Sequence, residues 1–140
     1  MNVAVVLLAA GASSRLGEPK ALAEIGGVKV LARMLSAIED GLGTLSTPTL
    51  VVTGAHHGPI AAFLSQLEEP PEVAFHPDWS MGRTTSVQAA ARLRPGQDML
   101  LWPVDVPLVS AGVLRSIASE WGRIGCPADG WLAPTADRMA

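Results

Sequence analysis

The sequence predicts an α/β domain, a three-layer sandwich built on a mostly parallel sheet. The opening run, residues 3–8, is apolar throughout and rich in β-branched residues, as in a central strand covered on both faces. Downstream, short β-type runs alternate with stretches whose apolar residues recur at helical spacing, which is typical of βαβ units. The 140 residues are 49% hydrophobic and 16% charged, which suits one globular domain and argues against disorder.

Segments in the first half of the chain follow this alternation. After the opening strand and its loop, segment 21–25 leads to a glycine pair at 26–27 that marks a turn. Residues 30–38 carry apolar side chains on one helical face and predict a helix, which Gly41 then ends. Residues 49–53, TLVVT, predict the second strand.

The middle of the chain repeats the pattern. Residues 60–67 predict a helix, and a proline pair three residues later stops it. Residues 72–75 predict a short third strand, and a polar loop follows. Three hydroxyl residues then predict the capped start of a helix over 84–93: Thr84, Thr85 and Ser86.

The last third supplies one further strand and helix, with a fifth strand after them. Residues 99–102 predict the fourth strand, and Ser110 is the expected cap of a helix that runs to Trp121. Its predicted inward residues are Val113, Leu114, Ile117 and Ala118. Residues 130–133 predict the fifth strand. Right-handed crossovers would join these strands into a Rossmann-like parallel sheet, and no internal repeat or linker divides the chain.

Charge and cysteine content narrow the classes of function. A net charge of −3 argues against a general nucleic-acid coat and against a polybasic membrane surface. Cys126 is the single cysteine, which excludes an intrachain disulfide and a cysteine metal cluster. No apolar window reaches the ~18 residues of a membrane helix, and no basic region precedes the first apolar run. These features predict a cytoplasmic protein without nucleic-acid or membrane partners.

Residues 8–20, LAAGASSRLGEPK, form the stretch with the clearest chemistry. Glycine lets a backbone approach a ligand closely, and successive N–H groups of such a turn form a concavity that suits an anion. Arg15 and Lys20 add full positive charges, and Ser13 and Ser14 add hydroxyl donors. The stretch therefore predicts a phosphate-binding loop. The alternative is an ordinary strand-to-helix connection with a surface arginine and lysine.

The glycine spacing excludes two common phosphate loops. Gly11 and Gly17 are six positions apart and Glu18 follows, whereas a Walker A loop needs G-x-x-x-x-G-K-[ST]. Ser13 stands where a dinucleotide fingerprint needs its second glycine.

The pattern LAAG-x-S-x-R-x-G-x-x-K resembles the signature loop of the MobA-like nucleotidyltransferases, and its form is closest to the molybdenum cofactor cytidylyltransferase branch. The matching residues are Leu8, Ala9, Ala10, Gly11, Ser13, Arg15, Gly17 and Lys20. The resemblance implies a fold of the nucleotide-diphospho-sugar transferase type. It also implies transfer of a nucleoside monophosphate from an NTP, CTP or GTP, to a phosphorylated small molecule such as molybdopterin cofactor, with release of pyrophosphate.

Asp105-Val-Pro107 resembles the D-x-P element of this family, whose aspartate binds Mg²⁺. Magnesium prefers hard oxygen ligands and is usually held by one or two carboxylates together with substrate phosphates. Because ligands of such sheets lie outside the carboxyl ends of the strands, Asp105 and the loop after the first strand should meet. The alternative is that Asp105 only begins a turn before Pro107.

Residues 76–86, HPDWSMGRTTS, resemble the family segment N-x-x-W-x-x-G-x-x-x-S, which helps to receive the nucleoside and the acceptor phosphate. His76 stands where the asparagine is usual. Trp79 could equally be a core aromatic, and Arg83 a solvated charge. The binding residues implied here are Asp78, Gly82 and Ser86. His56 and His57 lack a third ligand nearby in sequence and are expected to be loop residues.

Together these motifs define one predicted site. Arg15 and Lys20 would offset charge on the α-phosphate and the leaving pyrophosphate, and Asp105 would hold Mg²⁺. The acceptor phosphate would be the nucleophile, so no general base is needed. The backbone cradle of the triphosphate would comprise Leu8, Ala9, Ala10, Gly11, Ala12, Ser13 and Ser14.

Members of the family are longer, so residues 1–140 are expected to be a single nucleotidyltransferase-like domain that lacks the C-terminal third of the family domain. This keeps two alternatives open: a non-catalytic nucleotide-binding or fragment domain, and a transferase that acts on a sugar or alcohol phosphate. A sheet edge left open by the shorter chain would favour a homo-oligomer.

Overall fold

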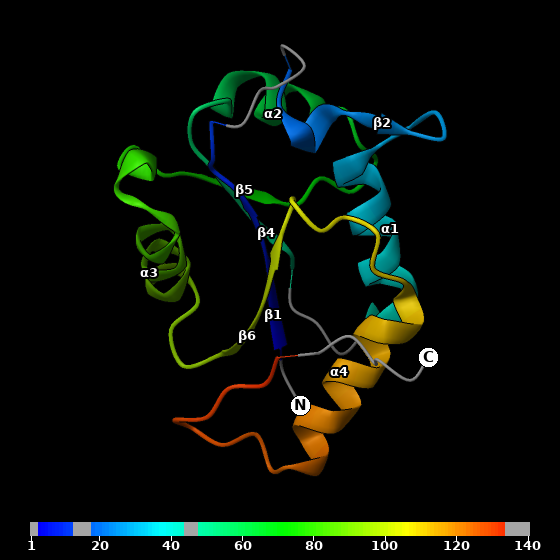
Figure 1. Cartoon of the computed structure of the whole chain (residues 1–140), viewed down its shortest axis with the longest axis vertical. Helices are drawn as coiled ribbons and strands as arrows, with labels where there is room; N and C mark the ends of the chain where they lie inside the picture. Colours follow the sequence, from blue (N-terminus) through cyan, green and yellow to red (C-terminus); the bar gives the residue numbers. More distant parts are fainter. Residues whose placement is uncertain (1–2, 13–17, 44–47, 134–140) are drawn as a thin grey trace.

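The computed structural model describes residues 3–12, 18–43 and 48–133. Strands and helices alternate along the chain, as the sequence predicts (Figure 1). The strands are β1 (Val3–Ala9), β2 (Glu24–Ile25), β3 (Val28–Lys29), β4 (Leu50–Thr53), β5 (Glu72–Phe75) and β6 (Asp98–Pro103). The α-helices are α1 (Val30–Gly41), α2 (His57–Leu64), α3 (Arg83–Leu93) and α4 (Ala111–Arg123), and the short 3₁₀ helices are η1 (Lys20–Leu22) and η3 (Trp79–Met81).

A four-stranded parallel sheet in the order β5-β4-β1-β6 forms the centre of the molecule. β1 pairs with β4 on one side and with β6 on the other, so that Val6 lies opposite both Leu50 and Leu101. The chain builds outward from β1 through β4 to β5 and then returns to the other side of β1. This reversal of strand order lies between β1 and β6, and the predicted α/β class with a mostly parallel sheet is confirmed.

Helices cover both faces of the sheet, which makes three layers (Figure 1). Val5 and Leu7 of β1 face a core shared with α1, α2 and α4, whereas Val6 and Leu8 face a smaller core with α3. Because neighbouring side chains of a strand point to opposite faces, an unbroken apolar run is what a strand between two cores requires. Every residue of β1 is buried.

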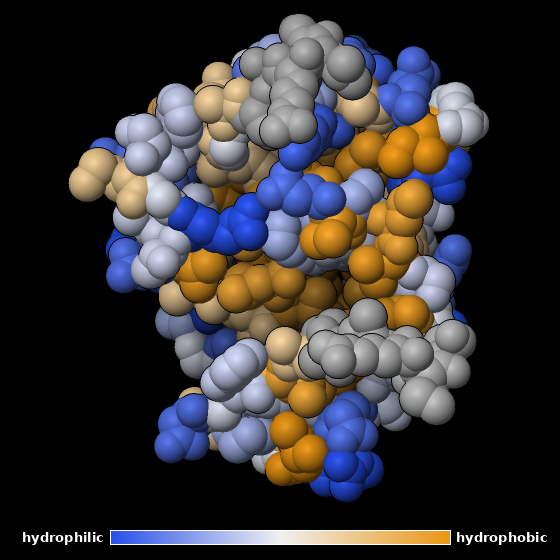
Figure 2. Space-filling model, in the orientation of Figure 1, coloured by the Kyte–Doolittle hydropathy of each residue, from blue (hydrophilic) through white to orange (hydrophobic). Residues whose placement is uncertain are grey.

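β6 lies at one edge of the sheet within the described residues, and β5 lies at the other. Leu101 on β6 and Val106 and Leu108 just after it are exposed large hydrophobic residues. Figure 2 shows apolar side chains gathered around the middle of the face of the molecule that is seen in Figure 1. Among the described residues β6 is therefore an edge strand, and self-association through it stays a prediction.

α4 begins at a capped end. The Ser110 side chain accepts a hydrogen bond from the Val113 backbone N–H, with the two atoms 3.2 Å apart. Among the predicted inward residues of α4, Leu114 and Ala118 are buried and Ile117 is half-buried. Val113 is exposed, so that part of the prediction is wrong: its neighbour Leu114 points into the core, and Val113 lies on a more outward side of the same turn.

Loss of this cap should cost stability without touching the rest of the fold. We expect Ser110→Ala to lower the free energy of unfolding by ~1 kcal/mol, because one backbone N–H at the helix start loses its partner. Urea denaturation, monitored by circular dichroism, measures this loss of stability. Ser116→Ala, an exposed change on the same helix, is the matched control and should leave stability unchanged or slightly higher. Equal effects of the two changes would contradict the prediction.

The prediction of a helix over 60–67 is wrong at both ends, because α2 spans His57–Leu64 and so begins and ends three residues earlier. At the end, Gln66 and Leu67 N–H groups donate to the carbonyls three residues earlier, so the chain continues in tighter turns. Leu67 still packs against the core, which is why the apolar spacing outlasts the helix. The expectation that His57 is a loop residue is also wrong, since it begins α2.

α3 starts one residue earlier than predicted and without the predicted cap. Gly82 occupies the N-cap position with φ of 109°, a conformation that glycine adopts readily. No side chain caps this end, and the Thr85 hydroxyl instead donates to the Gly82 carbonyl over 2.7 Å. The predicted capping role of the three hydroxyl residues is therefore wrong.

Two further differences concern strands. Residues 130–133 form no strand, and Trp131 is exposed, because this segment lies outside the sheet, whose described edge is β6. The glycine turn at 26–27 closes the β2–β3 hairpin, with positive φ at both glycines. A two-residue turn of this kind matches the twist of paired strands, although the flanking strands were not predicted.

None of the helices in the described ranges combines the length and apolar character that crossing a membrane requires.

Candidate functional site

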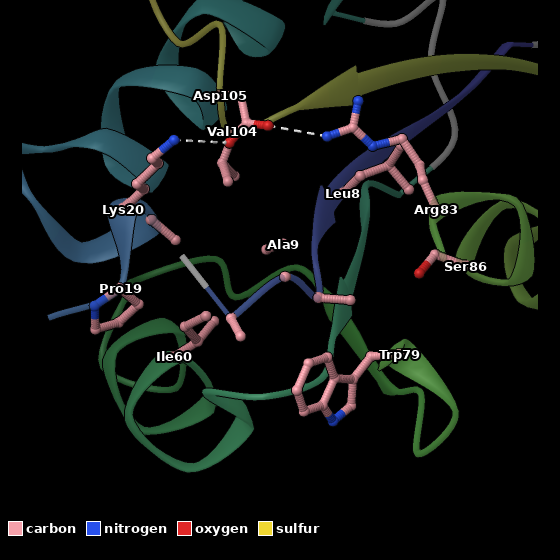
Figure 3. A pocket seen from close by; sticks show the side chains of 14 residues that line it. Leu8, Ala9, Pro19, Lys20, Ile60, Trp79, Arg83, Ser86, Val104 and Asp105 are labelled. Carbon is pink, nitrogen blue, oxygen red and sulfur yellow. Dashed lines mark hydrogen bonds and ion pairs between the residues drawn. The ribbon is translucent and has the colours of Figure 1, made fainter. Parts of the chain in front are cut away.

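A cavity of about 280 Å³ lies at the carboxyl ends of β1 and β6, where the strand order reverses (Figure 3). In open α/β sheets this is the position at which ligands bind. The end of β1 and the loop after it, residues 8–12, form one wall, and Val104 and Asp105 after β6 form another. Lys20 and Arg83 also reach the cavity, from η1 and α3 respectively.

The wall after β1 is made of small residues held by backbone bonds. The Ala55 N–H donates to the Ala10 carbonyl over 3.1 Å, and the Val104 N–H donates to the Leu8 carbonyl over 3.2 Å. These bonds fix the segment to its neighbours on both sides. Because Ala9, Ala10 and Ala12 have small side chains and Gly11 has none, the backbone stays open to the cavity.

Three charged side chains meet at the rim, and we call them the charged triad: Lys20, Asp105 and Arg83. Lys20 Nζ lies 3.4 Å from Asp105 Oδ1, and Arg83 Nη2 lies 2.9 Å from Asp105 Oδ2. Figure 3 shows the two cations approaching the carboxylate from opposite sides. Lys20 and Asp105 are 85 residues apart in sequence, so the predicted meeting of the two segments is present.

The charged triad remains in contact with water, since each of the three side chains is about half exposed, at 48%, 45% and 59% for Lys20, Asp105 and Arg83. Exposed ion pairs exchange partners easily because solvent screens them. Two cations face one carboxylate, so the rim keeps one positive charge in excess. Such a rim attracts an anion such as a phosphate group.

A buried tryptophan holds the turn that carries Asp105. The Trp102 indole N–H donates to the Val106 carbonyl over 2.7 Å, and the Val106 N–H donates to the Pro103 carbonyl over 3.2 Å. Trp102 is 4% exposed, which leaves its ring little freedom. The sequence predicts Asp105 but not this support, because the bond depends on how the turn folds back over β6.

Trp79 and Ser86 reach the cavity from the other side of the sheet. Trp79 packs against the core beneath α3, as a core aromatic would, and also lines the cavity; a binding role for it stays a prediction. Gly54 makes that packing feasible, since a Cβ there would lie 2.6 Å from the Ala10 carbonyl oxygen and 2.6 Å from Trp79 Cβ. Ser86 is buried, and its hydroxyl points toward the cavity (Figure 3).

Two predicted binding residues lie away from this cavity. Asp78 lines a separate hollow beside His76 and Thr85, and Gly82 forms the N-cap of α3. His76 Nε2 and Thr85 Oγ1 are 2.8 Å apart in a hydrogen bond, which ties the loop after β5 to α3. His76 is buried and holds this loop, and Asp78 is exposed outside the lining of the cavity.

Ser13, Ser14 and Arg15 lie outside the described residues, and their predicted roles stay predictions.

Asp105 is the acidic residue of the cavity lining, and the described parts of the chain contain no cluster of three or more His, Cys, Asp or Glu residues. A dedicated all-protein metal cage is therefore absent from those parts. A single half-exposed carboxylate at the mouth of a cavity suits Mg²⁺, which keeps several waters and takes further oxygen ligands from substrate phosphates. The donor set fits a cation that arrives with a nucleotide.

Comparison with known proteins gives a consistent picture. A family described as "MobA-like NTP transferase domain" matches residues 5–138. The bifunctional protein GlmU of Leifsonia xyli subsp. xyli (strain CTCB07) is 31% identical over 121 residues, which are 83% of this chain and 24% of that protein. A nucleotidyl transferase from Methanothermobacter thermautotroptrophicus, Mth528, superposes with a TM-score of 0.70 at 28% identity, over 84% of this chain and 56% of that one.

A complex of Rv0371c from Mycobacterium tuberculosis H37Rv with manganese shares the fold, with a TM-score of 0.62 at 23% identity, over 87% of this chain and 60% of that one. The chain thus spans about a quarter of the length of the curated relative and a little over half of these structures.

Proposed function

This chain belongs to the MobA-like NTP transferase domain family, and we propose that it transfers a nucleoside monophosphate from an NTP to a phosphorylated small molecule with release of pyrophosphate. The observation that carries the proposal is the contact of Lys20 with Asp105 at the mouth of the cavity, across 85 residues of sequence. A cation and a carboxylate at the strand ends of β1 and β6 are what Mg·NTP requires of a binding site.

The proposed step forms one bond and breaks one. An oxygen of the acceptor phosphate attacks the α-phosphorus of the NTP, and the bond from that phosphorus to the oxygen leading to the β-phosphate breaks. Pyrophosphate leaves with the electron pair. Because the attacking phosphate is already anionic, no side chain has to remove a proton, and catalysis depends on positioning and charge.

Each residue of the site is assigned one part in this proposed step. Backbone N–H groups after β1 would face the triphosphate, and Lys20 would offset charge on the leaving pyrophosphate. Asp105 would hold Mg²⁺, which when bound supplies Lewis-acid polarisation of the phosphates. Ser86 would donate its hydroxyl to the bound nucleotide, and Trp79 would pack against it. Ser13, Ser14 and Arg15 would complete the phosphate cradle.

The substrates form the finer part of the proposal. The loop pattern from Leu8 to Lys20 supports CTP as the nucleotide and molybdopterin cofactor as the acceptor. A sugar phosphate or an alcohol phosphate is the alternative acceptor. Pyrophosphate release measured with each of the four NTPs, in the presence of each acceptor class, tests this choice. Nucleotide binding without turnover for every pair would contradict the transferase and support a binding domain.

Removal of the Lys20 charge should weaken nucleotide binding. We expect Lys20→Ala to raise the dissociation constant of Mg·CTP by about tenfold, because a charged hydrogen bond to phosphate is lost. Isothermal titration calorimetry measures it directly. Arg92→Ala removes a positive charge from the exposed part of α3, outside the cavity lining, and is the control. Equal affinities of the two variants would contradict the assignment of Lys20.

A further inference from the structure

Arg83 is the member of the charged triad that occupies an unspecified position of the family segment at 76–86, so that the pattern assigns it no role of its own. It is the first residue of α3, and its guanidinium contacts Asp105 Oδ2 over 2.9 Å. Lys20 contacts the other oxygen of the same carboxylate. From this arrangement we propose that Arg83 binds the phosphate group of the acceptor. It would do so when Asp105 holds a divalent cation and no longer pairs with Arg83. The inference rests on the proposed function.

The first step concerns the carboxylate. A cation held by Asp105 would occupy lone pairs that Arg83 and Lys20 use in the described state. It would also repel both side chains. Since Arg83 is 59% exposed and its partner 45%, their pair is weakly held and opens at little cost. If Asp105 held a cation, the Arg83 guanidinium would be free within reach of the cavity.

The second step concerns direction. In-line displacement places the entering acceptor and the leaving pyrophosphate on opposite sides of the α-phosphorus. Lys20 comes from the segment after β1, the proposed triphosphate wall, and approaches Asp105 from one side (Figure 3). Arg83 approaches from the opposite side. If Lys20 faces the leaving group, Arg83 faces the entering phosphate.

The third step concerns chemistry. A guanidinium presents a planar set of donors that fits two oxygens of a phosphate at once, and it stays charged at every relevant pH. Ser86, one turn further along α3, is directed at the same cavity. Arg83 thus lies one turn from a hydroxyl that lines the same cavity, on the side that we assign to the second phosphate.

The test uses inorganic phosphate as the probe, on the whole chain saturated with Mg²⁺ and a non-hydrolysable α,β-methylene analogue of CTP. We expect Arg83→Gln to weaken phosphate binding about tenfold in calorimetry, and Arg83→Lys to restore part of it. The affinity for the CTP analogue should not fall, because Arg83 is not assigned to the nucleotide. Arg92→Gln, on the same helix but outside the cavity lining, is the control and should match the parent.

A second readout needs no nucleotide. Because Arg83 competes with a cation for Asp105, Arg83→Gln should bind Mn²⁺ alone a few-fold more tightly than the parent, measured by electron paramagnetic resonance. Intact binding of the CTP analogue with phosphate affinity unchanged in Arg83→Gln would overturn this inference alone. Loss of analogue affinity in place of phosphate affinity would also overturn it. Failure of the parent to bind the analogue with Mg²⁺ would overturn the proposed function, and this inference with it.

Discussion

Asp105→Asn should reduce pyrophosphate release by about 10²–10³-fold, because the change removes the carboxylate proposed to hold the cation while it keeps the shape of the side chain. It also leaves Lys20 and Arg83 without their shared anion. A metal-free nucleotide should therefore bind the variant at least as tightly as it binds the parent. The gain in affinity that Mg²⁺ gives the parent should be absent.

Titration of CTP with and without Mg²⁺, together with the rate of pyrophosphate release, measures both effects. Asp40→Asn removes an exposed carboxylate from α1, outside the cavity lining, and should behave as the parent. Retention of the magnesium-dependent gain in Asp105→Asn would show that another group holds the metal. The loss of turnover must come with an unchanged unfolding midpoint, because Asp105 is half exposed and lies in a surface turn.

Gly54→Ala should impair both the fold and the site. The added Cβ would lie 2.6 Å from the Ala10 carbonyl oxygen and 2.6 Å from Trp79 Cβ, which is closer than packed atoms approach. Either the loop after β1 or Trp79 must move. We expect the free energy of unfolding to fall by ~1–3 kcal/mol, the usual cost of overpacking, and CTP affinity to fall with it.

Gly58→Ala is the matched control, because a Cβ at Gly58 meets no atom within 4 Å and the residue lies in α2. That change should leave stability equal or slightly higher, since alanine favours helix. Urea denaturation and CTP titration of both variants provide the comparison. Parent-like stability and affinity in Gly54→Ala would show that the contact of Trp79 with this strand end is not required.

The fold was predictable where side-chain periodicity and backbone pairing agree. β1 and α1 follow directly from an apolar run and an apolar helical face, and both are buried as that pattern requires. The end of α2 was not predictable, because Leu67 faces the core from a turn and extends the apolar spacing beyond the helix. Residues 130–133 have strand-like composition, but a strand also needs a neighbour to pair with.

For the site, topology carried more information than motif detail. Lys20 and Asp105 could be expected to meet because the carboxyl ends of adjacent parallel strands share one edge. The positions of Asp78 and Gly82 could not be expected from the sequence. The course of their loop depends on the His76–Thr85 bond and on the conformation of Gly82. The contact of Arg83 with Asp105 likewise depends on where α3 begins.

The place of β1 in the sheet also bears on how the chain is made. A ribosome releases β1 before both of its neighbours in the sheet, since β4 lies on one flank and β6 on the other. Its second flank stays open until Asp98–Pro103 has emerged, so this apolar strand waits for a partner that lies far along the chain. Sheets closed by such distant pairings form slowly, and a strand that waits for its partner is exposed to aggregation in the meantime.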